Sequence, residues 1–158
     1  MRCSVLFPRI SKCFSTFRLL PNFRSIHSQY GINLSADKPT SYPISDAEYE
    51  RVSNKALESL ADTFDRLPEI YSLSTDYDVE YAYGVLKVTF GPQVGTYIVN
   101  RQAPNKQLWL SSPRSGPRRY DYISSKDIWV YKHDGKSLHE LLSEEISEIV
   151  GDSVNFHT

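Results

Sequence analysis

Two segments of the chain carry apolar residues at helical spacing. An apolar residue recurs every three or four positions in residues 45–67 and again in residues 137–151. Ser45 and Ser137 each stand three residues before a glutamate, which is typical of a capping box at the start of a helix. Pro68 follows the first periodic segment and is expected to end it. The pattern predicts two amphipathic helices.

The region between these helices alternates apolar and polar residues in short runs bounded by Gly, Pro and Asn. Such runs predict half-buried strands, and their short connections favour antiparallel pairing. The expected strands are residues 76–83, 85–90, 95–102, 106–111, 119–122 and 128–132. We therefore predict an α+β fold, a two-layer α-β sandwich with two helices on one face of an antiparallel sheet of about five to six strands.

Charge divides the chain of 158 residues, whose net charge is only -1. Residues 1–36 contain five basic and no acidic residues, residues 37–80 carry a net -7, and residues 81–158 a net +1. A basic, acid-free start with interspersed apolar residues is typical of an organelle presequence. We predict a mitochondrial transit peptide and linker in 1–36 and one folded domain in 37–158. A disordered basic N-terminus without an import role is the alternative.

Cysteine usage limits the chemistry that the processed protein could perform. Cys3 and Cys13 both lie in the expected presequence, so no disulfide, cysteine nucleophile or thiolate metal site is expected after processing. The sequence contains no phosphate-binding loop, dinucleotide fingerprint or nucleophile elbow. No run of 18 apolar residues is present, so no membrane insertion is expected. We predict no catalytic residues.

The first helix carries acidic residues on the side opposite to its apolar stripe, among them Glu50, Glu58 and Asp62. In the first strand, Asp76 and Asp78 fall on one face. Carboxylates are hard ligands that suit Mg²⁺, Ca²⁺, Mn²⁺ and iron, and without cysteines such sites are open, weak and labile. A solvated surface and a docking surface for a basic partner are the alternatives.

A second group of polar residues lies on one face of the predicted sheet. If Leu108 and Leu110 face the helices, Trp109 faces solvent near Gln107, and Arg119 lies close by. An exposed Trp among amides is typical of an interaction hot spot. Burial of Trp109 in the core is the alternative. Basic and aromatic residues also occur in RNA-binding proteins, but no RNA-binding motif is present and no nucleic-acid partner is predicted.

Three long motifs resemble the frataxin family. They are GTYIVNRQAPNKQLWLSSP at residues 95–113, SGPRRYDY at 115–122 and WVYKHDGKSLHELL at 129–142. The resemblance extends over about residues 44–150 and is to the mitochondrial frataxins of lower eukaryotes, with a fungus as the expected source. The fold that the resemblance implies is the sandwich predicted above.

The resemblance also implies a function. It indicates a mitochondrial matrix protein that binds iron weakly and promotes iron–sulfur cluster assembly by binding and activating the complex of cysteine desulfurase and scaffold protein. It further implies iron supply to haem synthesis, with ferrochelatase as a partner, and a monomer that forms oligomers with iron. The alternative is a ferroxidase that oxidises Fe²⁺ and stores iron in oligomers. An allosteric activator and iron donor is favoured, because the mature chain has no nucleophile beside a base.

Site residues follow from the resemblance by position. The iron-binding carboxylates, here called the acidic ridge, are Asp46, Glu50, Glu58, Asp62, Asp65, Asp76 and Asp78. The partner-binding residues, here called the sheet surface, are Asn100, Gln102, Asn105, Lys106, Gln107, Trp109 and Arg119. Asn54, Lys55 and Arg66 stand where relatives often carry acids, so a high iron stoichiometry is not expected. The short tail after Val150 predicts modest stability.

Overall fold

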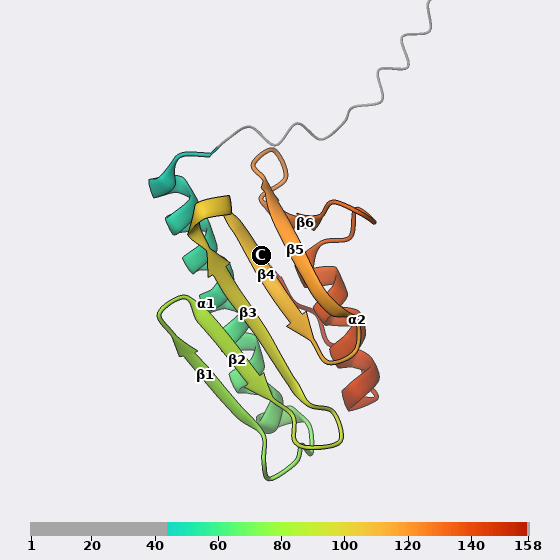
Figure 1. Ribbon diagram of the computed structural model, residues 1–158. Coiled ribbons are helices and arrows are strands. Elements are labelled where there is room, and N and C mark those ends of the chain that lie inside the picture. Colours follow the sequence, from blue (N-terminus) through green and yellow to red (C-terminus); the bar gives the residue numbers. More distant parts are fainter. Residues whose placement is uncertain (1–43, 158) are drawn as a thin grey trace, which may run out of the picture. The chain divides into compact units, whose positions relative to one another are not determined.

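The computed structural model describes residues 44–157 and shows two helices on one face of a six-stranded sheet (Figure 1). The helices are α1 (Asp46–Ile70) and α2 (Leu138–Val150). The strands are β1 (Asp78–Ala82), β2 (Val85–Thr89), β3 (Thr96–Gln102), β4 (Gln107–Ser112), β5 (Gly116–Ile123) and β6 (Ile128–Tyr131). They follow one another in sheet order, and each pair is antiparallel. The predicted fold class is confirmed, whereas the predicted transit peptide lies outside the described residues.

Helix α1 begins as predicted but does not end where predicted. The Ser45 hydroxyl accepts a hydrogen bond from the Glu48 amide at 3.1 Å. The expectation that Pro68 stops the helix is wrong, since α1 continues to Ile70. Proline has no amide hydrogen and therefore leaves the carbonyl four residues earlier, that of Phe64, without its helical partner. The Tyr77 hydroxyl donates to this carbonyl at 2.7 Å and replaces the lost bond.

Helix α2 has both of its predicted ends. The Ser137 hydroxyl accepts from the Glu140 amide, and the Glu140 carboxylate accepts from the Ser137 amide, which completes the capping box. At the other end Gly151 adopts a left-handed conformation with φ of 74°. Glycine adopts this conformation without steric cost and so ends the helix there.

The predicted loop at residues 113–117 is too long, because β5 begins at Gly116. Pro117 can lie in this strand for a structural reason. It pairs with Ser111 of β4, while β6 pairs only with the later part of β5, from Tyr120 onward. Proline is tolerated at the start of a strand and at positions without a second strand neighbour.

The core lies between the sheet and the two helices and is rich in aromatic side chains. The rings of Tyr49 and Trp129 meet edge to face at 6.2 Å. The tail after α2 completes the core, since Val154 and Phe156 are buried and the Phe156 ring lies 4.8 Å from that of Phe64. The predicted modest stability stays a prediction. Neither helix described within residues 44–157 has both the length and the apolar content needed to cross a membrane.

Candidate functional site

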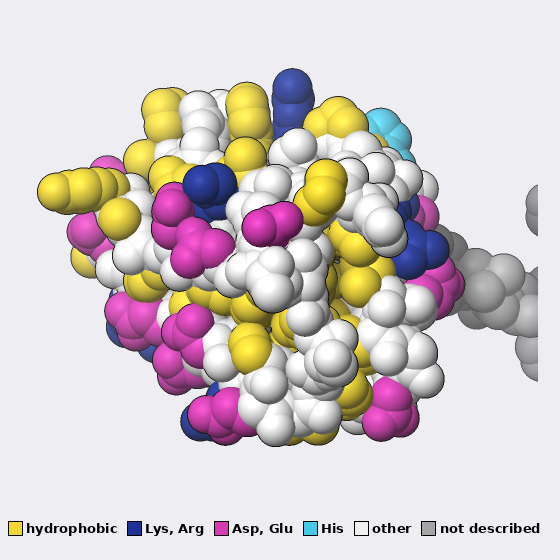
Figure 2. Space-filling view, turned by 90° about the horizontal axis from the view of Figure 1, so that it is seen from below, with side chains coloured by type: hydrophobic (Ala, Val, Ile, Leu, Met, Phe, Trp, Pro, Cys, Tyr) yellow, Lys and Arg dark blue, Asp and Glu magenta, His cyan; other side chains and the backbone are white. Residues whose placement is uncertain are grey.

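The acidic ridge lies along one edge of the domain, where α1 packs beside β1 (Figure 1). Five of its carboxylates are on α1, and all seven side chains are exposed. Asp78 opens β1, but Asp76 lies in the turn before this strand, so the prediction that it belongs to the strand is wrong. Figure 2 shows the domain from below, where Asp and Glu side chains gather mainly on the left, the side of β1, with a few Lys and Arg between them.

Ion pairs divide the ridge into two parts. At the start of α1, Asp46 pairs with Lys106 at 3.0 Å, and Glu50 lies 3.7 Å from Arg101. Further along, no basic group within residues 44–157 comes within 4 Å of the remaining carboxylates. These unpaired carboxylates are Glu58, Asp62, Asp65, Asp76 and Asp78. The negative charge available to a bound cation is therefore concentrated toward the end of α1 and the start of β1.

Two of the departures from the family pattern make structural contacts. Asn54 accepts a hydrogen bond from Arg101 at 2.8 Å. Lys55 contacts Asp127 at 2.9 Å, and the Tyr122 hydroxyl donates to the other oxygen of Asp127 at 2.6 Å. These hydrogen bonds, that of Tyr122 first, lower the pKa of Asp127. Lys55 thus ties α1 to the turn between β5 and β6.

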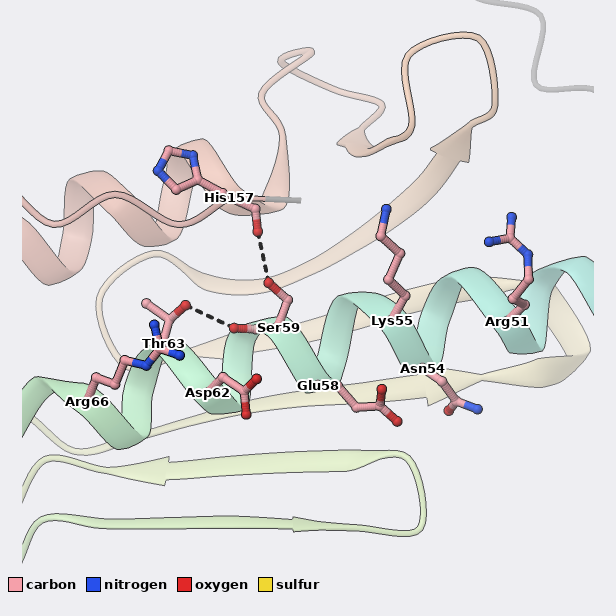
Figure 3. Close-up of a pocket in the computed structure, with 9 residues that line it drawn as sticks. All are labelled: Arg51, Asn54, Lys55, Glu58, Ser59, Asp62, Thr63, Arg66 and His157. Atoms are coloured by element: carbon pink, nitrogen blue, oxygen red, sulfur yellow. Dashed lines mark hydrogen bonds between the residues drawn. The ribbon is translucent and has the colours of Figure 1, made fainter.

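An open groove of about 680 Å³ runs beside the middle of α1. Figure 3 shows Glu58 and Asp62 pointing to the same side of the helix, while Arg51 and Lys55 point to the opposite side. The Ser59 hydroxyl donates to the backbone carbonyl of His157 at 3.0 Å, which holds the tail against the groove. The groove has both acidic and basic walls and is not a uniformly acidic pocket.

Two phenol groups lie near the unpaired carboxylates. Burial raises the pKa of Tyr77, and the nearby negative charge of Asp65 raises it further. Burial likewise raises the pKa of Tyr81, with a second contribution from Glu58. Both phenols therefore stay protonated at neutral pH, and the negative charge of this edge resides on carboxylates alone.

The ridge carboxylates do not converge on one point. Within residues 44–157, no three His, Cys, Asp or Glu side chains come close enough together to hold a metal ion. A divalent cation on this surface would be held by one or two carboxylates and by water. Such binding is weak and fast to exchange, which suits a transferable ion better than a permanent one.

The sheet surface lies on the face turned away from the helices. Asn100 of β3, Trp109 of β4 and Arg119 of β5 are directly opposite one another in adjacent strands. Trp109 is half-buried and outside the core, while Leu108 and Leu110 are 0% and 2% exposed on the helix side. The expected orientation of Trp109 is confirmed, but it is less exposed than expected because its neighbours cover part of the ring.

Contacts between these side chains hold them in place. The Arg119 guanidinium lies 4.5 Å from the centre of the Trp109 ring. The indole nitrogen of Trp109 donates to the Gln107 side-chain oxygen at 3.0 Å, and the Gln107 amide nitrogen donates to Asp121 at 2.8 Å. Sequence reasoning did not include Asp121, although its alternation with Tyr120 and Tyr122 places it on the outer face.

The remaining predicted partner-binding residues differ in placement. Gln102 of β3 lies opposite Gln107 of β4, next to the pair formed by Asn100 and Trp109. Asn105 is exposed in a short 3₁₀ helix, Ala103–Asn105. Lys106 has a left-handed backbone and turns toward α1, where it donates to the Ile44 carbonyl and pairs with Asp46. Lys106 therefore connects the sheet surface to the acidic ridge.

Residues 42–152 match the family model described as "Frataxin-like domain". The chain belongs to the frataxin family. It is 49% identical over 125 residues to the mitochondrial frataxin homolog of Drosophila melanogaster, a match that covers 77% of this chain and 66% of that protein. It is 47% identical over 105 residues to mitochondrial frataxin of Caenorhabditis elegans, a match that covers 66% of this chain and 76% of that protein. These relatives are named as mitochondrial, which supports a mitochondrial localisation.

A solved frataxin structure has the same fold. The trimeric frataxin of Saccharomyces cerevisiae, described as complexed with ferrous iron, superposes with a TM-score of 0.56 at 31% sequence identity. The superposition covers 75% of this chain and 96% of the yeast chain. The expectation of frataxin membership drawn from the three sequence motifs is confirmed.

Proposed function

We propose that this protein is a mitochondrial matrix frataxin that binds the complex of cysteine desulfurase and iron–sulfur scaffold protein, activates it, and supplies Fe²⁺. The observation that carries the proposal is the ordered group of Gln107, Trp109 and Arg119 on the open face of the sheet. A half-buried Trp with a stacked Arg is the composition of a binding hot spot. Because the ring and the guanidinium are already held, little ordering entropy is lost on binding.

In this proposal the protein acts by binding and performs no covalent step. Residues 44–157 contain no cysteine that could accept sulfur. The sulfur chemistry would therefore take place on the partner proteins, and this chain would stabilise their productive arrangement. Coupling of this kind between sites typically amounts to about 1–3 kcal/mol.

Iron enters the proposal as a transferable ion on the unpaired part of the acidic ridge. Fe²⁺ prefers carboxylate and water ligands when no thiolate is available. The dispersed carboxylates support weak, exchangeable binding in place of a fixed metal centre. The description of the yeast relative as complexed with ferrous iron supports Fe²⁺ as the ion. Supply of iron to haem synthesis, with ferrochelatase as a further partner, would use the same ions.

The test is desulfurase turnover with the purified complex in the presence of each variant. Trp109→Ala and Arg119→Glu should each lower the stimulation by about tenfold or more, because each removes a central contact. Matched controls are Val85→Ala on the same face of the sheet and Lys126→Glu in the exposed turn before β6. Thermal unfolding should show that all four variants remain folded. Full stimulation by both Trp109→Ala and Arg119→Glu would refute the proposal.

A second candidate function is oxidation of Fe²⁺ with iron storage in oligomers. The five unpaired carboxylates favour it, as does the trimeric state of the yeast relative. Oxygen consumption after addition of Fe²⁺ should fall when Asp62, Asp65, Asp76 and Asp78 are changed to Asn. Unchanged oxidation kinetics in this variant would count against ferroxidase activity at the ridge and would leave the activator role in place.

A further inference from the structure

A hollow of about 340 Å³ lies next to the sheet surface, where β6 ends and the chain turns toward α2. It shares Gln107 and Arg119 with the sheet surface. Its other walls come from β5 and from the residues at and just after the end of β6. These are Pro117, Arg118, Asp121, Tyr131, Lys132 and His133. None of the resemblance-based site residues apart from Gln107 and Arg119 belongs to it.

The walls of the hollow carry an excess of positive charge. Arg118, Arg119 and Lys132 face it, against the single carboxylate of Asp121. Asp121 already accepts the hydrogen bond from Gln107. Within residues 44–157, neither Arg119 nor Lys132 has a carboxylate within 4 Å. The hollow is therefore electrostatically suited to an anionic group.

The basic groups are held in position by aromatic rings. The Arg118 guanidinium lies 4.9 Å from the centre of the Tyr131 ring and gives one nitrogen to Asp134 at 2.6 Å. The His133 ring lies 5.0 Å from Tyr131 on the same wall. The Arg119 guanidinium is stacked on Trp109 and makes no hydrogen bond to a side chain or carbonyl within the described residues. Two planar guanidinium groups thus present N–H donors whose direction is already set.

We propose that this hollow is a binding pocket for a carboxylate group from an acidic segment of a protein partner. Guanidinium groups bind carboxylates through two parallel hydrogen bonds, and fixed guanidinium planes reduce the entropy lost on binding. The pocket is continuous with Gln107 and Arg119, so the partner that would supply the carboxylate is the one that binds the sheet surface. This choice of partner rests on the proposed function, whereas recognition of the anionic group does not.

The first experiment measures binding of a probe peptide of four glutamates to the full chain by amide chemical shifts at low ionic strength. Shifts should concentrate at residues 118, 119 and 131–134, and the affinity should fall about fivefold or more in Lys132→Gln. Arg118→Gln should have the same effect, but it also removes the pair with Asp134, which contributes to the fold, so the exposed Lys132 is the primary variant. Lys126→Gln is the matched control and should bind as the unmodified chain does.

Unchanged peptide affinity in Lys132→Gln would overturn the pocket. Inorganic phosphate tests for a small free anion as the natural occupant. We expect phosphate to bind more weakly than the peptide and to be displaced by it. Equal or tighter phosphate binding, together with full affinity of Lys132→Gln for the desulfurase–scaffold complex, would overturn the assignment to a protein partner.

The two proposals fail in different ways. If the pocket is correct, Lys132→Gln should weaken binding of the desulfurase–scaffold complex by severalfold while Trp109→Ala weakens it more. Loss of activation in Trp109→Ala with no effect of Lys132→Gln on the complex would refute the assignment of the pocket to this partner and retain the proposed function. Full activation by Trp109→Ala and Arg119→Glu would refute the proposed function, and the peptide titration would still decide whether the pocket binds carboxylates.

Discussion

The acidic ridge and the sheet surface differ in how far their side chains are organised before anything binds. On the ridge, Asp62, Asp65 and Asp78 are exposed and lack ionic partners within the described residues. On the sheet surface, Gln107, Trp109 and Arg119 contact one another and hold fixed positions. One region is rich in charge and poor in internal contacts, and the other has the opposite character.

This difference separates two kinds of recognition. Dispersed carboxylates attract cations over a distance but impose little geometry, so binding is weak and depends on salt. Interlocked side chains impose a shape and distinguish between partners. We therefore expect the ridge to select by charge and the sheet surface to select by shape. The experiments below test this contrast, from the largest expected effect to the smallest.

Lowering the pH should destabilise the whole domain, and with it both surfaces, because of His139. This side chain is 5% exposed, and neither ring nitrogen has a hydrogen-bond partner within the described residues. Burial, followed by the positive charge of His157, lowers the pKa of His139 to about 4. The unfolded chain binds the proton first, so stability is complete above about pH 6.5 and falls as the pH drops toward 4, by up to roughly 3 kcal/mol.

Urea unfolding at pH 7, 5.5 and 4.5 measures this loss. His139→Phe should make the free energy of unfolding depend less on pH. His133→Gln, at an exposed position, should leave this pH dependence unchanged. The same pH dependence in His139→Phe and the unmodified protein would exclude His139 as the cause. The comparison of the two surfaces should accordingly be made near neutral pH.

Trp109→Ala should separate the two surfaces most clearly. Affinity for the desulfurase–scaffold complex should fall by about 2 kcal/mol or more, because a central aromatic contact is lost. Fe²⁺ affinity should not change, since Trp109 lies on the face turned away from the helices. Calorimetric titrations with the complex and with Fe²⁺ measure both effects. A parallel loss of Fe²⁺ affinity would show that the two surfaces are coupled.

Tyr77→Phe tests whether the geometry of the ridge matters as well as its charge. The change removes the hydrogen bond to the Phe64 carbonyl and no charge, so stability should fall by about 1 kcal/mol. If the ridge selects by charge alone, Fe²⁺ affinity should remain the same. Chemical unfolding and a Fe²⁺ titration of this variant decide the question, and a severalfold loss of Fe²⁺ affinity would show that the spacing of helix and strand carboxylates is important.

Neutralising the unpaired carboxylates should have opposite effects on binding and on stability. Changing Asp62 and Asp65 to Asn should weaken Fe²⁺ binding, but it should stabilise the domain by a few tenths of a kcal/mol because repulsion along α1 is relieved. Asp46→Asn and Glu50→Gln are matched controls at positions that pair with Lys106 and Arg101. The control variants should bring no gain in thermal stability. An equal gain in the control variants and in the Asp62 and Asp65 variants would show that paired and unpaired carboxylates do not differ in their effect on stability.

The two-layer fold could be predicted because residue spacing reports burial directly. Alternation identified the inner and outer faces of β3 and β4, and periodicity identified the buried side of both helices. The errors concern Pro68, Pro117 and the start of β1, where Asp76 lies in a turn. Whether Pro68 ends the helix depends on whether another group donates a hydrogen bond to the carbonyl that it leaves free. Whether Pro117 can lie in a strand depends on how far the neighbouring strand extends. Neither can be read from the adjacent residues.

Distant pairing is the part of the candidate site that the sequence could not reveal. Lys106 and Asp46, or Arg101 and Glu50, are more than fifty residues apart and meet only in the fold. The basic hollow was missed for a related reason. Arg118 follows the alternation of the helix-facing residues, and only the end of β6 allows its guanidinium to reach the surface beside Lys132.

The bond between Tyr77 and the Phe64 carbonyl has a consequence for how this family varies. A residue with an amide hydrogen at position 68 would occupy that carbonyl itself and make the hydroxyl at position 77 redundant. The two positions should therefore change together among relatives, with proline accompanied by tyrosine and other residues accompanied by either tyrosine or phenylalanine. A pair of sites nine residues apart would then evolve as one unit.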